Sequence, residues 1–415
     1  MNRQIFVYAD LDNSLHFVGT LWTRQGKTRE SASFEYNEEW LLNPLRFALE
    51  PALQLTSGSV HTDNNRSLFG AIGDSAPDRW GRILIQREER RKARIENRSP
   101  HTLAEADYLL GVGDITRQGA LRFATTKGGE FLAPQDTTTI PPLVKLNELL
   151  NAATRICSDE DDDSDLKLLL APGSSLGGAR AKASVIERDG SLAIAKFPQT
   201  DDTWSVILWE KTAIDLAETS GISVPELRIE KVNGRNVLIL KRFDRFRNNR
   251  IPFLSAMSML TAMDNEAHSY LEIVDAIRVH GNKPEQNLHQ LWRRIVFNIL
   301  ISNTDDHLRN HGFLYDEKGW ILSPAYDLNP TPTDIKRRIL SLAIDRDDAT
   351  ASLELAYSVV YQFGLKIQEA KQIAGDVGRV VKNWRDCAIK NGINSKEINR
   401  MESAFEHKDL KLALA

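Results

Sequence analysis

The sequence predicts an α+β fold with two lobes, in which an antiparallel, β-rich N-terminal region precedes a mostly helical C-terminal lobe. Short apolar segments that flank turn dipeptides indicate the β-rich region, and these dipeptides are Asp12-Asn13, Asp189-Gly190 and Asn233-Gly234. Such dipeptides are typical of tight antiparallel hairpins. From residue 254 onward the apolar spacing is almost wholly helical, interrupted by a polar loop and one further hairpin over 313–322.

The composition is that of an ordinary globular protein. The 415 residues are 41% hydrophobic and 27% charged, which allows a buried core and roughly two lobes. A net charge of -4 gives no general indication of a nucleic-acid binder or a membrane-surface protein. Cys157 and Cys387 form no metal or redox spacing, and no apolar run has the length of a signal peptide or a membrane span. We therefore expect a cytoplasmic protein with no membrane partner.

Two strongly charged segments have no predicted function. Residues 74–95 predict a helix that is capped by Asp74 or Ser75 and turns a run of charges to solvent. Residues 158–165, SDEDDDSD, form a block of like charge that is typical of a mobile surface loop. We expect both segments to be solvated.

A glycine-rich segment, PGSSLGGARAK at 172–182, precedes the second predicted hairpin. Glycine lets backbone N–H groups approach phosphate oxygens closely, because no Cβ stands in the way. The segment matches neither the Walker NTPase pattern nor the dinucleotide-binding pattern. By itself it indicates a turn at least as readily as a phosphate site.

A lysine and a glutamate follow at positions where a charge needs a partner. Lys196 shares a face of its strand with Leu192 and Ile194, so a strand buried on that side carries the ammonium inward. Glu210 lies on the apolar face of a helix predicted over about 203–219. A buried ammonium needs an anion. We expect Lys196 and Glu210 to pair, as a strand lysine and a helix glutamate do in protein kinases.

The polar loop NTDDHLRNHGF, residues 303–313, has the spacing of a phosphoryl-transfer loop. Kinases place the aspartate that orients the attacking hydroxyl five residues before an asparagine that binds magnesium. Asp305 and Asn310 have this spacing, whereas Asp306 is one residue short. The spacing therefore assigns the base to Asp305 and leaves Asp306 without a role.

A second metal ligand is expected beyond the hairpin that follows this loop. Asp327 lies just after that hairpin, and together with Asn310 it would give Mg²⁺ the hard oxygen ligands that it prefers when it bridges ATP phosphates. His307 is expected to hold the shape of the loop rather than to transfer a proton. The order of these parts predicts phosphoryl transfer from ATP.

Five segments together resemble the HipA toxin kinases, the serine/threonine kinases of bacterial HipBA-type toxin–antitoxin systems. The segments are SSLGGARAK (174–182), IAKFP (194–198), LKRFDR (240–245), NTDDHLRN (303–310) and AYDL (325–328). The opening strands and GDSAPDRWGR agree as well, so that the resemblance spans about residues 1–390. It implies a protein-kinase-like fold in three parts. These are a β-rich subdomain with helices (1–130), an ATP-binding part with the Gly-rich loop (131–245) and a helical catalytic lobe (246–415).

The resemblance also implies a regulatory serine and a set of nucleotide-binding residues. By position, Ser175 matches the family's autophosphorylated serine, whose modification displaces the Gly-rich loop and inactivates the kinase. The segment Lys241-Arg242-Phe243 falls where the lobe-connecting strand reaches the adenine. The residues implied to bind the cofactor are Ser175, Gly177, Gly178, Ala179, Lys182, Lys196, Lys241, Arg242 and Phe243.

The partners that the resemblance implies are proteins. Members phosphorylate protein targets, with aminoacyl-tRNA synthetases the known class, and so stop translation and arrest growth, the state linked to persistence. A helix-turn-helix antitoxin dimer of the HipB kind binds them, and contact with operator DNA is mainly through this antitoxin.

Two other interpretations are open from the residues. Loops of the D-x-H-x-x-N type also occur in lipid kinases, so a phosphoinositide or small-molecule kinase is an alternative. A non-catalytic corepressor is another, although the base, both metal ligands and Lys196 are all present.

Overall fold

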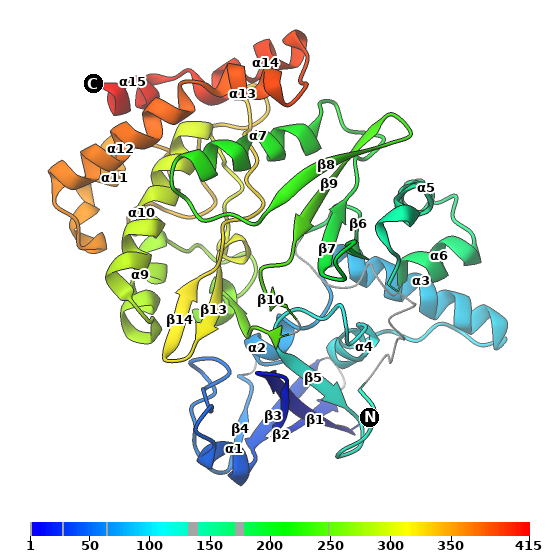
Figure 1. The fold of residues 1–415 in the computed structure, drawn as a ribbon. Coiled ribbons are helices and arrows are strands. Elements are labelled where there is room, and N and C mark those ends of the chain that lie inside the picture. The colour runs from blue at the N-terminus through cyan, green and yellow to red at the C-terminus, as the bar shows by residue number, and fades with distance from the viewer. Residues whose placement is uncertain (1, 27–28, 64, 132–139, 171–177, 248) are drawn as a thin grey trace. The chain divides into compact units, whose positions relative to one another are not determined.

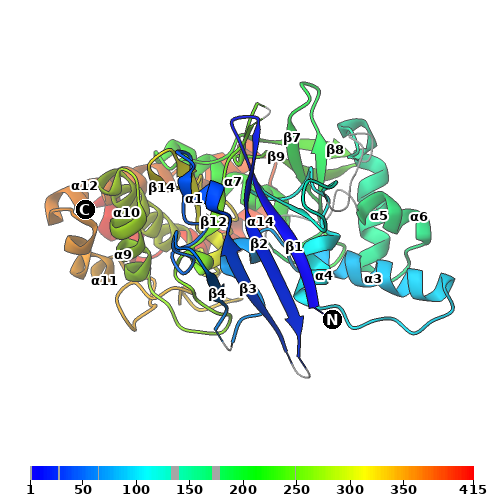
Figure 2. The ribbon, with the colours of Figure 1, turned by 90° about the horizontal axis from the view of Figure 1, so that it is seen from below.

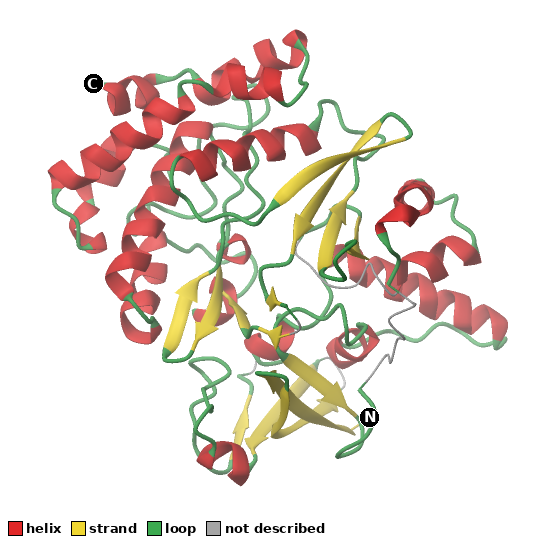
Figure 3. Ribbon diagram, in the orientation of Figure 1, coloured by secondary structure: helices red, strands yellow, loops and turns green. Residues whose placement is uncertain are grey.

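The computed structural model describes all residues except 1, 27–28, 64, 132–139, 171–177 and 248, and the chain forms two compact units (Figure 1). The first unit contains residues 1–200 and 230–254, and the second contains residues 201–229 and 255–415. Antiparallel sheets characterise the first unit and helices the second, as Figure 3 shows by colour. The predicted α+β class is confirmed.

A five-stranded antiparallel sheet opens the first unit, with the strand order β4-β3-β2-β1-β5. The strands are β1 (Asn2–Leu11), β2 (Ser14–Gln25), β3 (Glu30–Tyr36), β4 (Ser59–His61) and β5 (Leu121–Ala124), and Figure 2 shows β1, β2 and β3 side by side. Asp12 and Asn13 have φ angles of 50° and 58°, as the predicted tight hairpin requires. At Gly19 a Cβ would lie 2.3 Å from the Glu35 carbonyl oxygen, so only glycine lets β3 approach β2 there.

The helices that accompany this sheet correct one predicted boundary. They are α1 (Glu38–Leu42), α2 (Gly70–Gly73), α3 (Arg79–Ile95) and α4 (Glu105–Gly111). The cap of the long helix α3 is Asp78, whose carboxylate accepts from the Gly81 N–H at 2.8 Å, and not Asp74 or Ser75. Pro77 explains the shift, because a proline disfavours helical geometry at the residue before it but is well tolerated near a helix start.

A second antiparallel sheet of the first unit has the order β6-β7-β9-β8. Its strands are β6 (Lys182–Ile186), β7 (Leu192–Lys196), β8 (Leu227–Val232) and β9 (Arg235–Lys241), and the short strands β10 (Arg245–Phe246) and β11 (Asn249–Arg250) follow. Both predicted hairpins are present: Gly190, Asn233 and Gly234 all have the left-handed φ angles that these turns need. The 3-10 turn η2 (Leu143–Lys145) leads into α5 (Leu146–Cys157) and α6 (Asp163–Leu170), which share a buried core with one face of the sheet.

The acidic segment 158–165 is mostly exposed, as expected, but it runs into the helix α6 and pairs with arginines instead of forming only a loop. Arg87 of α3 pairs with Asp159 and Asp161, and its guanidinium also donates to the Ile156 carbonyl at 2.9 Å. Asp165 is 2% exposed and pairs with Arg155. The Asp162 carboxylate accepts from the N–H groups of Ser164 and Asp165 and so caps α6. Part of the charged face of α3, which was also expected to be solvated, therefore binds this segment.

The second unit is built around α10 (Pro284–Ile301), most of which is buried. Its first helix, α7 (Val206–Thr219), ends where Gly221 takes the left-handed conformation that its predicted role as a stop requires. Trp209 of α7 packs against a stacked ring pair, Trp384 and Phe405, whose centroids are 4.5 Å apart. No helix in the described part of the chain is long and apolar enough to cross a membrane.

The remaining elements confirm the predicted helical C-terminal region with one hairpin. The strands are β12 (Phe253–Ser255), β13 (Gly312–Asp316) and β14 (Gly319–Leu322), and the 3-10 turns are η3 (Leu308–Asn310) and η4 (Val360–Phe363). The helices are α8 (Ala256–Met259), α9 (Tyr270–His280), α11 (Leu353–Ser358), α12 (Ile367–Val381), α13 (Trp384–Lys390), α14 (Ser395–Phe405) and α15 (Lys408–Leu414). The polar loop at 303–311 joins α10 to β13.

Candidate active site

The loop at 303–311 is fixed at its entry, where α10 ends. Ser302 caps α10 in the left-handed conformation, with φ 52°. Its hydroxyl donates to the Ala404 carbonyl at 2.7 Å and accepts from Arg338 Nε at 3.0 Å. Because Ser302 is fully buried and bonded on both sides, the loop leaves the helix in one defined direction.

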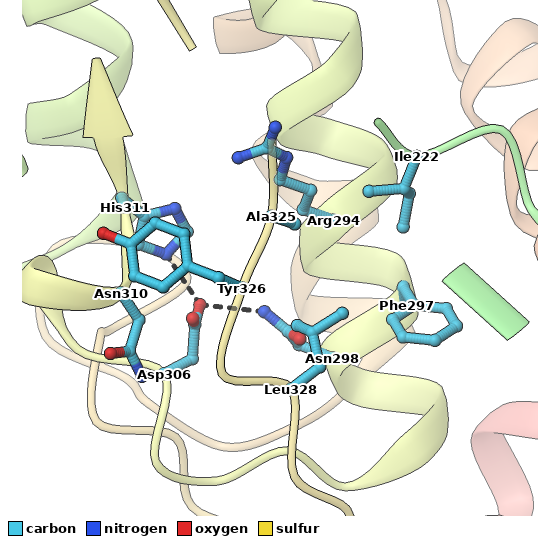
Figure 4. A pocket seen from close by; sticks show the side chains of 10 residues that line it. All are labelled: Ile222, Arg294, Phe297, Asn298, Asp306, Asn310, His311, Ala325, Tyr326 and Leu328. Atoms are coloured by element: carbon cyan, nitrogen blue, oxygen red, sulfur yellow. Dashed lines mark hydrogen bonds and ion pairs between the residues drawn. The ribbon is translucent and has the colours of Figure 1, made fainter. Parts of the chain in front are cut away.

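Within the loop, Asp306 is held in the protein interior. It is 2% exposed, and its Oδ2 accepts from Tyr270 Oη at 2.5 Å. The same oxygen accepts from Asn298 Nδ2 at 2.8 Å, as Figure 4 shows. The same oxygen lies 2.8 Å from His311 Nε2. Burial alone would raise the pKa of Asp306, but the charge of His311 and the hydrogen bonds from His311 and Tyr270 lower that pKa below its usual value. Asp306 is therefore an internal brace of the loop.

Asp305, the adjacent aspartate, has the opposite environment. Its side chain is exposed, and no described residue pairs or hydrogen-bonds with its carboxylate. Its backbone carbonyl accepts from the His307 N–H at 3.1 Å and from Asn310 Nδ2 at 3.0 Å. The loop thus fixes the backbone of Asp305 while it leaves the carboxylate accessible to an incoming hydroxyl.

Asn310 and His307 complete the turn. Because the Asn310 amide nitrogen donates to the Asp305 carbonyl, the amide oxygen is the atom that remains for a metal ion. The Asn310 N–H donates to the His307 carbonyl at 2.8 Å. His307 is half-buried, and its Nδ1 is buried without a partner among the described residues. The contacts of His307 are made by its backbone, and the role of its side chain stays a prediction.

The hairpin β13–β14 brings the segment of Asp327 back to this loop. Its ladder is extended by a bond from the Ser323 N–H to the Gly312 carbonyl at 2.8 Å. Tyr326 Oη then donates to the Arg309 carbonyl at 2.7 Å. This bond joins the residues that directly precede Asp327 and Asn310. Asp327 itself has a φ of 60°, an uncommon conformation for a non-glycine residue that clusters at functional sites.

The donor atoms of Asn310 and Asp327 fit a magnesium ion that also takes phosphate and water oxygens. Among the described residues no cluster of three or more histidine, cysteine, aspartate or glutamate side chains could hold a metal by itself. A site with two protein oxygens needs its remaining ligands from a bound substrate, as Mg²⁺ sites for nucleotides commonly do. The two side chains of the second unit thus suit a metal ion that binds together with a phosphate-containing substrate.

A small pocket lies beside this loop, and Figure 4 shows the side chains around it. Arg294 is 4% exposed there, and one of its terminal nitrogens donates to the Ser323 carbonyl at 2.5 Å. Burial lowers the pKa of Arg294 to about 10, and the negative charge of Asp306 partly offsets this lowering. The lining residues are Ile222, Arg294, Phe297, Asn298, Asp306, Asn310, His311, Ala325, Tyr326 and Leu328.

The Gly-rich segment of the first unit is described only at its C-terminal end. Ser175 and Gly177 lie outside the described residues, and Gly178 and Ala179 are exposed. Lys182 is 3% exposed, and its ammonium donates to Asp78 Oδ2 at 2.6 Å and to the Gly178 carbonyl at 3.0 Å. The pairing of Asp78 with Lys182 was not predicted from the sequence. The residues around Asp78 indicate only the start of a helix, and its partner lies 104 positions further along the chain.

The face of β7 that carries Lys196 was expected to be the buried one, but it is only half-buried, and the opposite face is the fully buried one. Ala193 and Ala195 are fully buried in the core of the first unit, whereas Leu192, Ile194 and Lys196 are half-buried on the opposite face. The small alanines allow the sheet to pack closely against α5 and α6, and this places the fully buried face there.

Glu210 is 2% exposed on α7, so its predicted burial is confirmed. It belongs to the second unit and Lys196 to the first, and their pairing stays a prediction.

The segment 241–243 stays a predicted nucleotide contact, and its three side chains differ in exposure. Lys241 is exposed at the end of β9, and the Phe243 ring lies 6.3 Å from that of Phe253. The Arg242 side chain is fully buried, where it pairs with Asp244 and donates to the Thr116 carbonyl at 2.6 Å. Its guanidinium is therefore committed to the protein interior.

Comparison with known proteins identifies the family of this chain. Residues 174–384, half of the chain, match the HipA-like C-terminal domain family, and the protein belongs to that family. A protein of Sinorhizobium fredii named "Putative kinase Y4mE" is 28% identical over 183 residues, which cover 38% of this chain and 42% of that protein. A "Putative kinase" of Haemophilus influenzae is 26% identical over 172 residues, 37% of this chain and 50% of that protein. The chain thus matches half or less of the length of these relatives.

A solved structure shares the fold over nearly the whole chain. It is HipA of Shewanella oneidensis MR-1, from the complex of the toxin–antitoxin system HipA, HipB and its operator DNA. The TM-score is 0.64 at 15% identity, and the alignment covers 99% of this chain and 96% of the other. The chain therefore has the kinase-like α+β fold of HipA.

Proposed function

We propose that this protein is an ATP-dependent serine/threonine protein kinase that acts as the toxin of a bacterial toxin–antitoxin pair. The observation that carries the proposal is the division of labour between adjacent aspartates. Asp306 is locked in the interior by three side chains, while Asp305 is exposed on a backbone fixed by Asn310 and His307. A general base must be both fixed and accessible to its substrate.

The roles of the residues follow from their surroundings. Asp305 orients the acceptor hydroxyl and takes its proton as the oxygen attacks the terminal phosphoryl group of ATP. The bond from that phosphorus to the bridging oxygen breaks, and ADP leaves with this oxygen. The amide oxygen of Asn310 and the carboxylate of Asp327 hold Mg²⁺, which when bound with ATP neutralises charge on the phosphate oxygens. Lys196, paired with Glu210, places a further positive charge at the phosphates. Because the transition state is loose, this positioning and charge supply most of the rate.

The physiological part of the proposal rests on the family and on the shared fold. The substrate is a protein of translation, of the aminoacyl-tRNA synthetase class, whose phosphorylation arrests growth and leads to persistence. A HipB-like helix-turn-helix antitoxin dimer binds the chain and carries it to operator DNA, by analogy with the Shewanella complex of HipA, HipB and operator DNA. Autophosphorylation of Ser175 in the Gly-rich loop then switches the kinase off.

The test uses the purified chain with ATP and Mg²⁺, and measures phosphate transfer to itself and to a bacterial lysate. Asp305→Asn should lower the transfer rate by a factor of about 10² to 10⁴ without a change in thermal stability, because the removed base is exposed. Asp347→Asn, which removes an exposed aspartate outside the loop, is the matched control and should keep full activity.

Mass spectrometry of the products decides the acceptor. Phosphate on serine or threonine, including Ser175, supports the proposal. Label that appears only in the lipid or small-molecule fraction would move the chain to another class of kinase. No transfer and no ATP binding by the unmodified protein would exclude a kinase altogether.

A further inference from the structure

The ion pair of Lys182 and Asp78 has no role in the proposed reaction, although it lies at the Gly-rich segment. Both side chains are nearly buried, with 4% and 8% of their surface exposed, and the distance between Nζ and Oδ2 is 2.6 Å. Burying two charges costs desolvation energy, so a buried ion pair need not stabilise the fold. Its second contact, from the ammonium to the Gly178 carbonyl at 3.0 Å, indicates what it does instead.

The contact to Gly178 fixes the direction of one peptide group. In a planar trans peptide the C=O of one residue and the N–H of the next point in opposite directions. Since the Gly178 carbonyl points to the buried ammonium, the Ala179 N–H points away from it. Ala179 is exposed, and no described residue accepts a hydrogen bond from its N–H. An outward backbone N–H next to a glycine is a donor suited to an anion.

The geometry of Gly178 depends on this arrangement. Its φ angle is 107°, a region that residues with a Cβ rarely adopt. A glycine can also turn its peptide over with little cost, so something must hold the orientation. Lys182 does this, and Lys182 is in turn held by the cap of α3 and by a bond from Trp80 Nε1 to the Lys182 carbonyl at 2.9 Å.

The register of the sheet explains why Lys182 needs the Asp78 carboxylate as a partner. Lys182 of β6 lies directly opposite Lys196 of β7, and residues so paired project on the same face of a sheet. Two ammonium groups at such positions repel each other. Asp78 neutralises the buried one, so the half-buried Lys196 remains the more accessible positive charge of the two.

We propose that Asp78 and Lys182 are positioning residues that orient the Gly178–Ala179 peptide, so that the Ala179 N–H binds a nucleotide phosphate. The inference rests on the proposed function, because it takes the ligand to be a nucleoside triphosphate. Lys182 acts on the loop backbone and not as a phosphate ligand. A residue at the start of α3, outside the segment that matches the family, thereby controls the phosphate contact.

The test measures the affinity for a fluorescent ATP analogue in the presence of Mg²⁺, with the full-length protein. Asp78→Asn keeps the capping ability for α3 but removes the charge. It should weaken nucleotide binding about tenfold, as Lys182→Met should, and the double variant should be no weaker than either single one. Asp78→Glu should restore part of the affinity. Arg94→Ala, which breaks an exposed pair of the same helix with Asp163, is the matched control and should bind as the unmodified protein does.

Each outcome is decisive. Additive losses would show that Asp78 and Lys182 act independently, and the inference would fail. It would also fail if Asp78→Asn bound as tightly as or more tightly than the unmodified protein, because Lys182 would then be a phosphate ligand held back by Asp78. If Asp78→Asn unfolds, Lys182→Met and Lys182→Arg decide alone, since only a loss in both supports a geometric role. No binding to the unmodified protein would instead defeat the proposed function itself.

Discussion

The loop 303–311, which we propose to be catalytic, and the segment LKRFDR at 240–245 are both rich in charge, yet their charges are placed differently. In the loop, one aspartate is buried and its neighbour is exposed. In LKRFDR, Asp244 is 2% exposed and binds Arg242, Arg245 and the Gly119 N–H at 2.8 Å. These side chains join β9 to the chain around residues 116–119 and keep the carboxylate of this segment away from solvent.

The difference separates the loop proposed to be reactive from a segment that only joins parts of the fold. Both have a buried carboxylate whose pKa is lowered by cationic partners against the effect of burial. Of the two, the loop 303–311 also holds a second acid that no described residue pairs with, on a backbone that the loop contacts fix. A dense polar motif therefore indicates chemistry only when one of its groups remains accessible.

The largest expected effect on stability tests the segment LKRFDR. Asp244→Asn leaves Arg242 and Arg245 buried without their anion, and burial already lowers the pKa of Arg245 to about 9. Removing one member of a buried ion-pair network costs about 3–5 kcal/mol. The free energy of unfolding from a denaturant titration should fall by that amount, while phosphate transfer per folded molecule stays unchanged. A selective loss of activity would show that this segment does take part in catalysis.

A smaller effect on stability is expected in the loop, combined with a loss of activity. Asp306→Asn keeps an acceptor for Tyr270 and Asn298 but loses the charge that His311 faces. Charge-assisted hydrogen bonds contribute about 1.5–3 kcal/mol, and the denaturation midpoint should fall accordingly. Activity should drop less than in Asp305→Asn, because the base is still present but less well held. Complete inactivity with unchanged stability would move the base to Asp306.

The smallest expected effect is the loss of folding stability at low pH, which both the Asp244 network and the Asp306 network should show. Asp244 and Asp306 both have a pKa below the ordinary value of 3.8, so each adds stability that is present above that value and lost as the pH falls through the folded-state pKa. For each, the loss should begin as the pH falls below about 4, where the carboxyl group of the unfolded chain takes up its proton. Denaturation as a function of pH should show a shallower decline in Asp244→Asn than in the unmodified protein. Equal slopes would mean that Asp244 does not titrate as its contacts indicate.

The hairpins, the order of the parts and the burial of Glu210 could be predicted from the sequence because each depends on short-range pattern. Turn dipeptides select their conformations locally, and helical spacing reveals the apolar face of α7. The choice between Asp305 and Asp306 followed from spacing to Asn310, and their opposite exposure agrees with it.

What the sequence did not reveal are contacts between distant segments. The buried face of β7 is decided by which helices pack on the sheet, and alanine alternates there with larger residues that suggest the opposite face. Arg87 of α3 and the acidic segment each appear solvated alone, and only the fold shows that they pair. The same holds for Asp78 and Lys182, which lie 104 positions apart.

The two compact units are each discontinuous in the chain, which decides how the protein can be dissected. The backbone passes between them at residues 200, 229 and 254, so no single cut yields one intact unit. A fragment limited to the family segment 174–384 would lack the Asp78 carboxylate for Lys182 and would lose Phe405 from its stack on Trp384. Screening of soluble fragments for binding or crystallisation should therefore begin from the full chain, and activity missing in a shorter piece would say nothing about its catalytic residues.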